Sequence, residues 1–165
     1  MKIVEQKRST FSAIALIFGI LYLFISVMEF IHISLNEPLI FFFSSPGDTL
    51  FETSYLDHLM KGFINLVISS MFLYTFFKLK EGTLEGFGFL IGAGFLSFGI
   101  GLLFIAEWIA NLIDFLLIGI MEPEIWEGFT ITDGIRLECF LGIASIYILW
   151  IWKNKERYLT LDNKF

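Results

Sequence analysis

The stretch from residue 86 to residue 120 limits what this chain can fold into more than any other part of the sequence. Nearly all of its residues are Phe, Leu, Ile, Gly or Ala, and only Glu107, Asn111 and Asp114 are strongly polar. About 20 apolar residues suffice to cross the hydrocarbon core of a bilayer. The stretch therefore predicts a membrane-spanning helix, in which each carboxylate needs a partner and a reason to be there.

The rest of the chain repeats this apolar character. Hydrophobic residues make up 56% of the 165 residues, more than a soluble domain of this size can bury. The runs predict four spans, at about residues 11–35, 54–77, 86–112 and 132–152. The remaining segments are expected to be outer loops at 36–53 and 113–131, an inner loop at 78–85 and a polar tail at 153–165. The predicted fold class is all-α, an integral membrane four-helix bundle forming one domain over residues 1–165.

The third span has two features of its own. As one straight helix, residues 86–120 would be roughly 50 Å long, against a hydrocarbon core of about 30 Å. We therefore expect a break or bend between Asn111 and Gly119. Small residues recur four apart in its first half and predict close helix packing: Gly88 and Gly92, and Ala93, Ser97 and Gly101.

Basic residues set the expected orientation. Nine of the eleven fall in the two terminal segments and in the 78–85 loop. Because basic loops stay in the cytoplasm, we predict that both termini are cytoplasmic (N-in, C-in) in a multi-pass protein of the cell membrane. The loops 36–53 and 113–131 then lie outside.

Polar residues near the outer ends of all four spans are expected to share one level of the membrane. Counting about 20 residues outward from the basic anchors reaches this level in each span. The residues concerned are Glu29, His32, Asp57, His58, Lys61, Glu107, Asn111, Asp114, Asp133, Arg136 and Glu138.

Four of these residues have a structural explanation. Ser54 with Asp57, and Thr130 with Asp133, resemble helix caps at the starts of the second and fourth spans. We predict that Asp57 pairs with Lys61 and that Asp133 pairs with Arg136, since residues three or four apart are neighbours on a helix.

Six other residues of this level are candidates for binding a cation or a proton, and the favoured function is of the transport or channel type. These candidates are Glu29, His32, Glu107, Asn111, Asp114 and Glu138. Converging acids at a membrane edge can hold a cation or pass protons. No catalytic motif or metal-binding spacing is present, so a non-enzymatic function is favoured and no metal site is expected.

Other functions stay open. The apolar outer loops could dock an accessory subunit onto a membrane complex, or cover a lipid or quinone. His32 and His58, the only histidines, could ligate haem. Besides the bilayer, we expect a homo-oligomer or a larger membrane complex as partner, and no nucleic acid.

A tandem duplication is also suggested. Residues 18–25 and 98–105 match at six of eight positions, and the two cap patterns follow in the same order. Two copies of a two-span hairpin would be related by an axis along the membrane normal.

Overall fold

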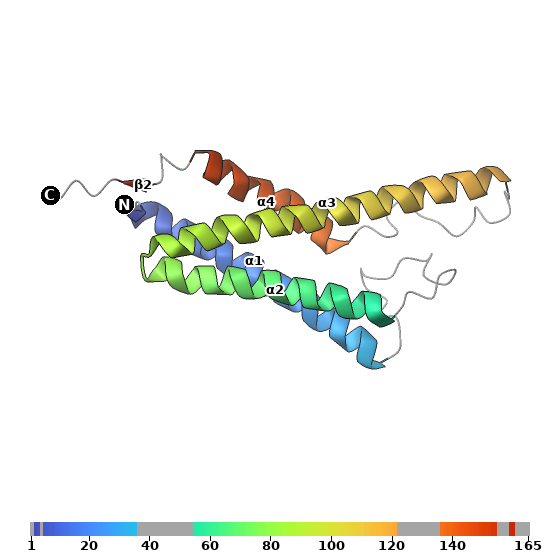
Figure 1. Cartoon of the computed structure of the whole chain (residues 1–165), viewed down its shortest axis with the longest axis horizontal. Coiled ribbons are helices and arrows are strands. Elements are labelled where there is room, and N and C mark those ends of the chain that lie inside the picture. The colour runs from blue at the N-terminus through green and yellow to red at the C-terminus, as the bar shows by residue number, and fades with distance from the viewer. Residues whose placement is uncertain (1, 4, 36–54, 122–135, 155–158, 161–165) are drawn as a thin grey trace.

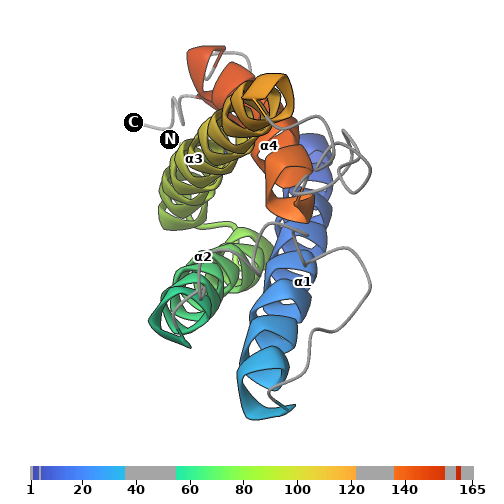
Figure 2. The same ribbon diagram turned by 90° about the vertical axis from the view of Figure 1, so that its right-hand side faces the viewer.

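Four α-helices form the bundle that the apolar runs predict (Figure 1). The computed structural model describes residues 2–3, 5–35, 55–121, 136–154 and 159–160. In chain order the helices are α1 (Glu5–Leu35), α2 (Tyr55–Lys80), α3 (Leu84–Met121) and α4 (Leu137–Lys153). Figure 2 shows two pairs, α1 beside α2 and α3 beside α4, and α2 packs on α3 between them.

Three of the helices are long and apolar enough to cross a membrane by themselves. Their candidate spans are Arg8–Ile31, His58–Lys80 and Leu84–Ala110. α4 has 17 residues, or roughly 26 Å, near the lower limit for a span. Large apolar side chains such as Ile17, Phe63 and Leu103 are exposed on the outside of the bundle, as lipid-facing residues would be.

The start of α1, the end of α4 and the α2–α3 connector lie at the same end of the bundle (Figure 1). Strand β1 (Lys2–Ile3) pairs antiparallel with strand β2 (Leu159–Thr160). Of the two strands, β2 lies within the segment expected to be a polar tail. We call this end, with Arg8, Lys78, Lys80 and Lys153, the basic end. Its cytoplasmic location remains a prediction.

A tight turn joins α2 to α3 at the basic end. Gly82 has φ +77°, a conformation that suits a residue without Cβ. The hydroxyl of Thr83 donates to the carbonyl oxygen of Lys78 at 3.0 Å, which satisfies one of the free carbonyls that end α2. The helices thus reverse direction in fewer residues than the expected loop of 78–85.

Serine and glycine bring α1 and α2 together. Ser26 of α1 donates to the carbonyl oxygen of Gly62 at 2.9 Å, and Ser69 of α2 donates to that of Gly19 at 2.8 Å. A Cβ on Gly19 would lie 2.8 Å from the side chain of Leu73, which shows how closely the helices approach. Small residues with interhelical hydrogen bonds are a usual means of packing helices in lipid.

The backbones of α3 and α4 touch. A Cβ built on Gly101 would lie 2.5 Å from the Cα of Gly142. Ser97 and Ala93, one turn and two turns earlier on α3, are completely buried. The close packing predicted for these three residues of α3 is confirmed. It is wrong for Gly88, where an added Cβ would meet no atom within 4 Å.

Two predicted features of the helices are wrong. α3 is a single helix of 38 residues with no break between Asn111 and Gly119, because neither Pro nor Gly occurs from residue 102 to residue 118. α4 begins at Leu137 rather than near residue 132, since Arg136 is its N-cap with extended backbone (φ −94°, ψ 154°) and makes no side-chain cap. The preceding Gly134 is a poor helix former.

The suggested duplication remains a prediction. Gly19 and Gly99 occupy equivalent places in the two matching segments. Gly19 is packed against Leu73, whereas Gly99 has open space around it. The two segments therefore do not share this packing contact.

Candidate functional site

Charged and polar side chains, most of them buried, gather from all four helices and the N-cap of α4 near the end of the bundle opposite the basic end. We call this group the charge cluster: Glu29 of α1, His58, Lys61 and Asn65 of α2, Glu107 of α3, and Arg136 and Glu138 at the start of α4. All except Glu107 are at most 8% exposed. Burying a charged group costs free energy unless the group has a partner. The contacts within the cluster are therefore what offsets the cost of burying it.

Glu29 joins three parts of the cluster. Its Oε2 lies 2.8 Å from Nδ1 of His58, a hydrogen-bond distance. Its Oε1 lies 3.9 Å from NH1 of Arg136, an ion pair that connects α1 to the start of α4. A single carboxylate of α1 thus contacts both an imidazole and a guanidinium.

Both basic side chains of the cluster lie over the ring of Phe104. Nζ of Lys61 lies 5.8 Å from the centroid of the Phe104 ring, and Cζ of Arg136 lies 5.2 Å from it. Both distances suit an attraction between a cation and the face of a ring. Lys61 also lies 3.8 Å from Oε1 of Glu107, whose side chain is 46% exposed at the edge of the cluster.

Glu138 has the most enclosed carboxyl group of the cluster. It is 0% exposed, and Asn65 donates from Nδ2 to its Oε1 at 3.2 Å. Its other oxygen, Oε2, has no hydrogen-bond partner among the described residues, and neither has Oδ1 of Asn65. Such atoms are rare in native proteins and call for an explanation.

A buried pair of hydroxyls lies on the basic-end side of the cluster. The hydroxyl groups of Tyr22 and Ser97 are 2.7 Å apart, and both residues are 0% exposed. Ser97 lies 3.5 Å from the carbonyl oxygen of Leu141, to which it can donate. Tyr22 precedes Glu29 by two turns of α1, or roughly 10 Å toward the basic end.

Six of the residues singled out from the sequence come together in this cluster: Glu29, His58, Lys61, Glu107, Arg136 and Glu138. The side chains of His32, Asp57, Asn111 and Asp114 lie outside the described residues, although their backbones belong to helices. Asp133 is also outside them. The predicted pairs Asp57–Lys61 and Asp133–Arg136 therefore stay predictions, and so do the roles assigned to the outer loops.

Sequence reasoning missed two contributors, Asn65 and Phe104. His58, which the sequence places at the outer level and offers as a haem ligand, contacts Glu29. Asn65 follows Lys61 by four residues, and an amide in an apolar span was a usable signal for the carboxyl of Glu138. Phe104 gave no signal, since it is one of 21 phenylalanines. Within the described ranges, no three His, Cys, Asp or Glu side chains come close enough to hold a metal ion.

Comparison with known proteins gives a family and no function. The chain matches no curated protein and no solved structure. A protein family described as MJ0565 integral membrane domain matches residues 5–154, which include all four helices and the whole charge cluster. This match covers well over half of the chain and agrees with its apolar helices. The chain belongs to the MJ0565 integral membrane domain family.

Proposed function

We propose that this membrane protein binds a proton in the charge cluster and passes protons through it. The observation that supports this most strongly is the buried carboxyl group of Glu138, with one oxygen hydrogen-bonded to Asn65 and the other without a partner among the described residues. A charged carboxylate in such a place is costly, whereas a protonated one costs less. Glu138 is therefore the proposed proton-binding group.

Nearby positive charge favours a proton over a metal cation. Arg136 is buried beside Glu29, and Lys61 is buried beside Glu107. These two cations offset two of the three carboxylates and repel a further metal cation at short range. A proton differs because it neutralises a carboxyl group covalently and needs no shell of ligands.

The contact between Glu29 and His58 provides a step for proton transfer. A carboxyl group and an imidazole at hydrogen-bond distance can exchange a proton, and histidine is the side chain best suited to this near neutral pH. The hydroxyls of Tyr22 and Ser97 continue the polar groups toward the basic end. The proposed relay uses Glu138, Glu29 and His58, with these hydroxyls leading inward.

The first test concerns proton binding. In lipid nanodiscs at neutral pH, infrared spectra of the wild-type protein should contain the carbonyl stretching band of a protonated carboxylic acid, and Glu138→Gln should remove it. Glu107→Gln is the matched control, because this exposed carboxylate is paired with Lys61 and should not contribute to the band. A spectrum without the band, or a band that persists in Glu138→Gln, would contradict the proposal.

The second test concerns proton transfer. Proteoliposomes with a trapped pH-sensitive dye should show proton flux above that of protein-free liposomes, and Glu29→Gln should return it to that background. Glutamine keeps the shape of the side chain and a hydrogen bond to His58 but cannot take up a proton. Glu81→Gln, an exposed change in the α2–α3 turn, should leave the flux unchanged. Equal flux in wild type and Glu29→Gln would remove the relay from the proposal.

A further inference from the structure

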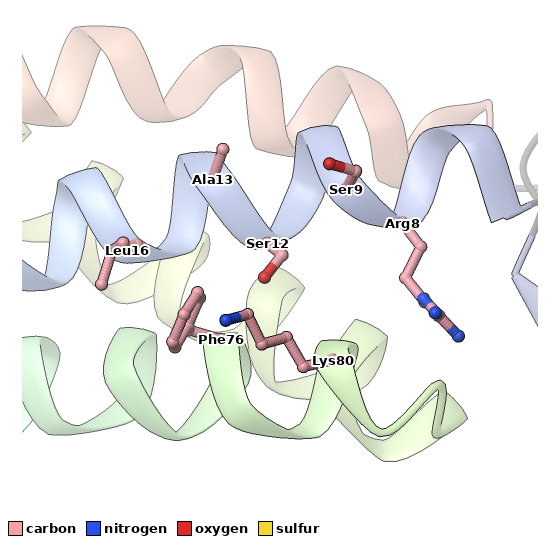
Figure 3. Close-up of a pocket in the computed structure, with 7 residues that line it drawn as sticks. All are labelled: Arg8, Ser9, Ser12, Ala13, Leu16, Phe76 and Lys80. Carbon is pink, nitrogen blue, oxygen red and sulfur yellow. The ribbon is translucent and has the colours of Figure 1, made fainter.

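A second polar site lies at the basic end, far from the charge cluster. A pocket of about 520 Å³ opens between α1 and α2 (Figure 3). Its lining includes Arg8, Ser9, Ser12 and Leu16 of α1, and Phe76 and Lys80 of α2. The pocket thus combines two cations and two hydroxyls with an apolar wall.

The described residues that line this pocket carry a net positive charge. Arg8 and Lys80 line it, and no carboxylate of the described residues does. Nζ of Lys80 lies 4.5 Å from the centroid of the Phe76 ring, and the described residues place no acid in a salt bridge with Lys80 or Arg8. Lys78, two residues earlier and outside the pocket, contrasts with them because it is paired with Glu81 at 2.9 Å.

Ser12 adds a buried hydroxyl to these cations. The residue is only 6% exposed, and its Oγ has no hydrogen-bond partner among the described residues. Figure 3 shows Oγ pointing across the pocket toward the amine of Lys80. A buried hydroxyl facing a cation can donate to an acceptor that the cation attracts, and this combination indicates an anion.

The position of the pocket relative to the membrane indicates where the anion comes from. Arg8 is the first residue of one candidate span, and Lys80 is the last residue of another. Both therefore lie at the membrane edge, where the head groups of lipids are found. Basic pockets between membrane helices on one side of the bilayer commonly hold phosphate-bearing head groups.

We propose that this pocket binds the phosphate of an anionic membrane lipid. Arg8 and Lys80 hold the phosphate oxygens, the hydroxyl of Ser12 donates to one of them, and Leu16 and Phe76 face the start of the acyl chains. The ligand lies in the leaflet at the basic end, and its binding is independent of the proton site.

Native mass spectrometry of the full-length protein tests the proposal, with an equal mixture of phosphatidylglycerol and phosphatidylcholine added to the detergent. The wild type should retain phosphatidylglycerol selectively. Each basic side chain strengthens anionic lipid binding about fivefold, so the double variant Arg8→Gln, Lys80→Gln should lose roughly twenty-five-fold of this preference. The conservative variant Lys80→Arg should keep it, and Ser12→Ala should weaken it with the charges unchanged.

The matched control, Lys78→Gln with Lys153→Gln, removes two charges from the same end but outside the pocket, and should keep the preference. An equal loss in this control would overturn the proposal, because net charge alone would then explain binding. Thermal stabilisation by inorganic phosphate, equal to that by phosphatidylglycerol, would also overturn it in favour of a free anion. Slow maleimide labelling of the buried Cys139, as in the wild type, verifies that each variant is folded.

Discussion

Replacing Arg136 with methionine is expected to destabilise the protein by about 3–5 kcal/mol, the largest effect expected of any single substitution in the charge cluster. Arg136 is 6% exposed, and its guanidinium lies beside the buried carboxylate of Glu29 and the ring of Phe104. Methionine fills a similar volume but leaves Glu29 with less compensating charge. The free energy of unfolding, measured by titration with sodium dodecyl sulfate and followed by circular dichroism, would show the loss.

A double-mutant cycle separates this charge effect from a packing defect. If the cost arises from the uncompensated carboxylate, Arg136→Met should cost much less in the Glu29→Gln background than in the wild type. Lys78→Met serves as a control for removing a cation, because Lys78 is paired with Glu81 on the exposed surface and its loss should have little effect. Additive costs in the cycle would show that the contact with Glu29 is not the cause.

Replacing Gly101 with leucine is expected to push α3 and α4 apart at a cost of about 1–3 kcal/mol. The first side-chain atom alone would lie 2.5 Å from the Cα of Gly142, and a backbone atom cannot rotate away as a side chain can. Cys139, the only cysteine, is buried on α4 close to this contact. Maleimide labelling of Cys139 should therefore become faster in Gly101→Leu, alongside a lower free energy of unfolding.

Gly99→Leu is the matched control for this substitution. Gly99 is two residues away on the same helix, and a Cβ added there would meet no atom within 4 Å. Leucine there should leave Cys139 labelling unchanged and stabilise the helix slightly, since leucine is the better helix former. If the two variants behave alike, the close approach of α3 and α4 is not what Gly101 provides.

The number and type of helices could be predicted from the sequence because both follow from local properties. A run of apolar residues long enough to cross a bilayer must be helical, whatever it packs against. The ends of the helices depend on more. The break expected after Asn111 relied on bilayer thickness alone, which does not interrupt a helix that has neither Pro nor Gly from residue 102 to residue 118 and continues to Met121.

The sequence was enough to predict the depth of the candidate site in the membrane, but not which of its side chains are in contact. Counting residues along each span placed Glu29, Lys61 and Glu107 at a similar depth, and all three belong to the charge cluster. Which side chains touch depends on the rotation of each helix about its axis, and contacts such as Ser26 with Gly62 fix that rotation. Local pairing rules cannot foresee that Arg136 reaches Glu29, a residue 107 positions away in the chain.

The unbroken length of α3 has a mechanical consequence. Figure 1 shows this helix extending past the described ends of its neighbours, and it has no hinge between Gly101, where it touches α4, and Met121. A force on the protruding end of α3 would therefore tilt the whole helix about its contact with Gly142. Phe104 lies one turn from that contact, so tilting of the helix would move its ring relative to the two cations that lie over it.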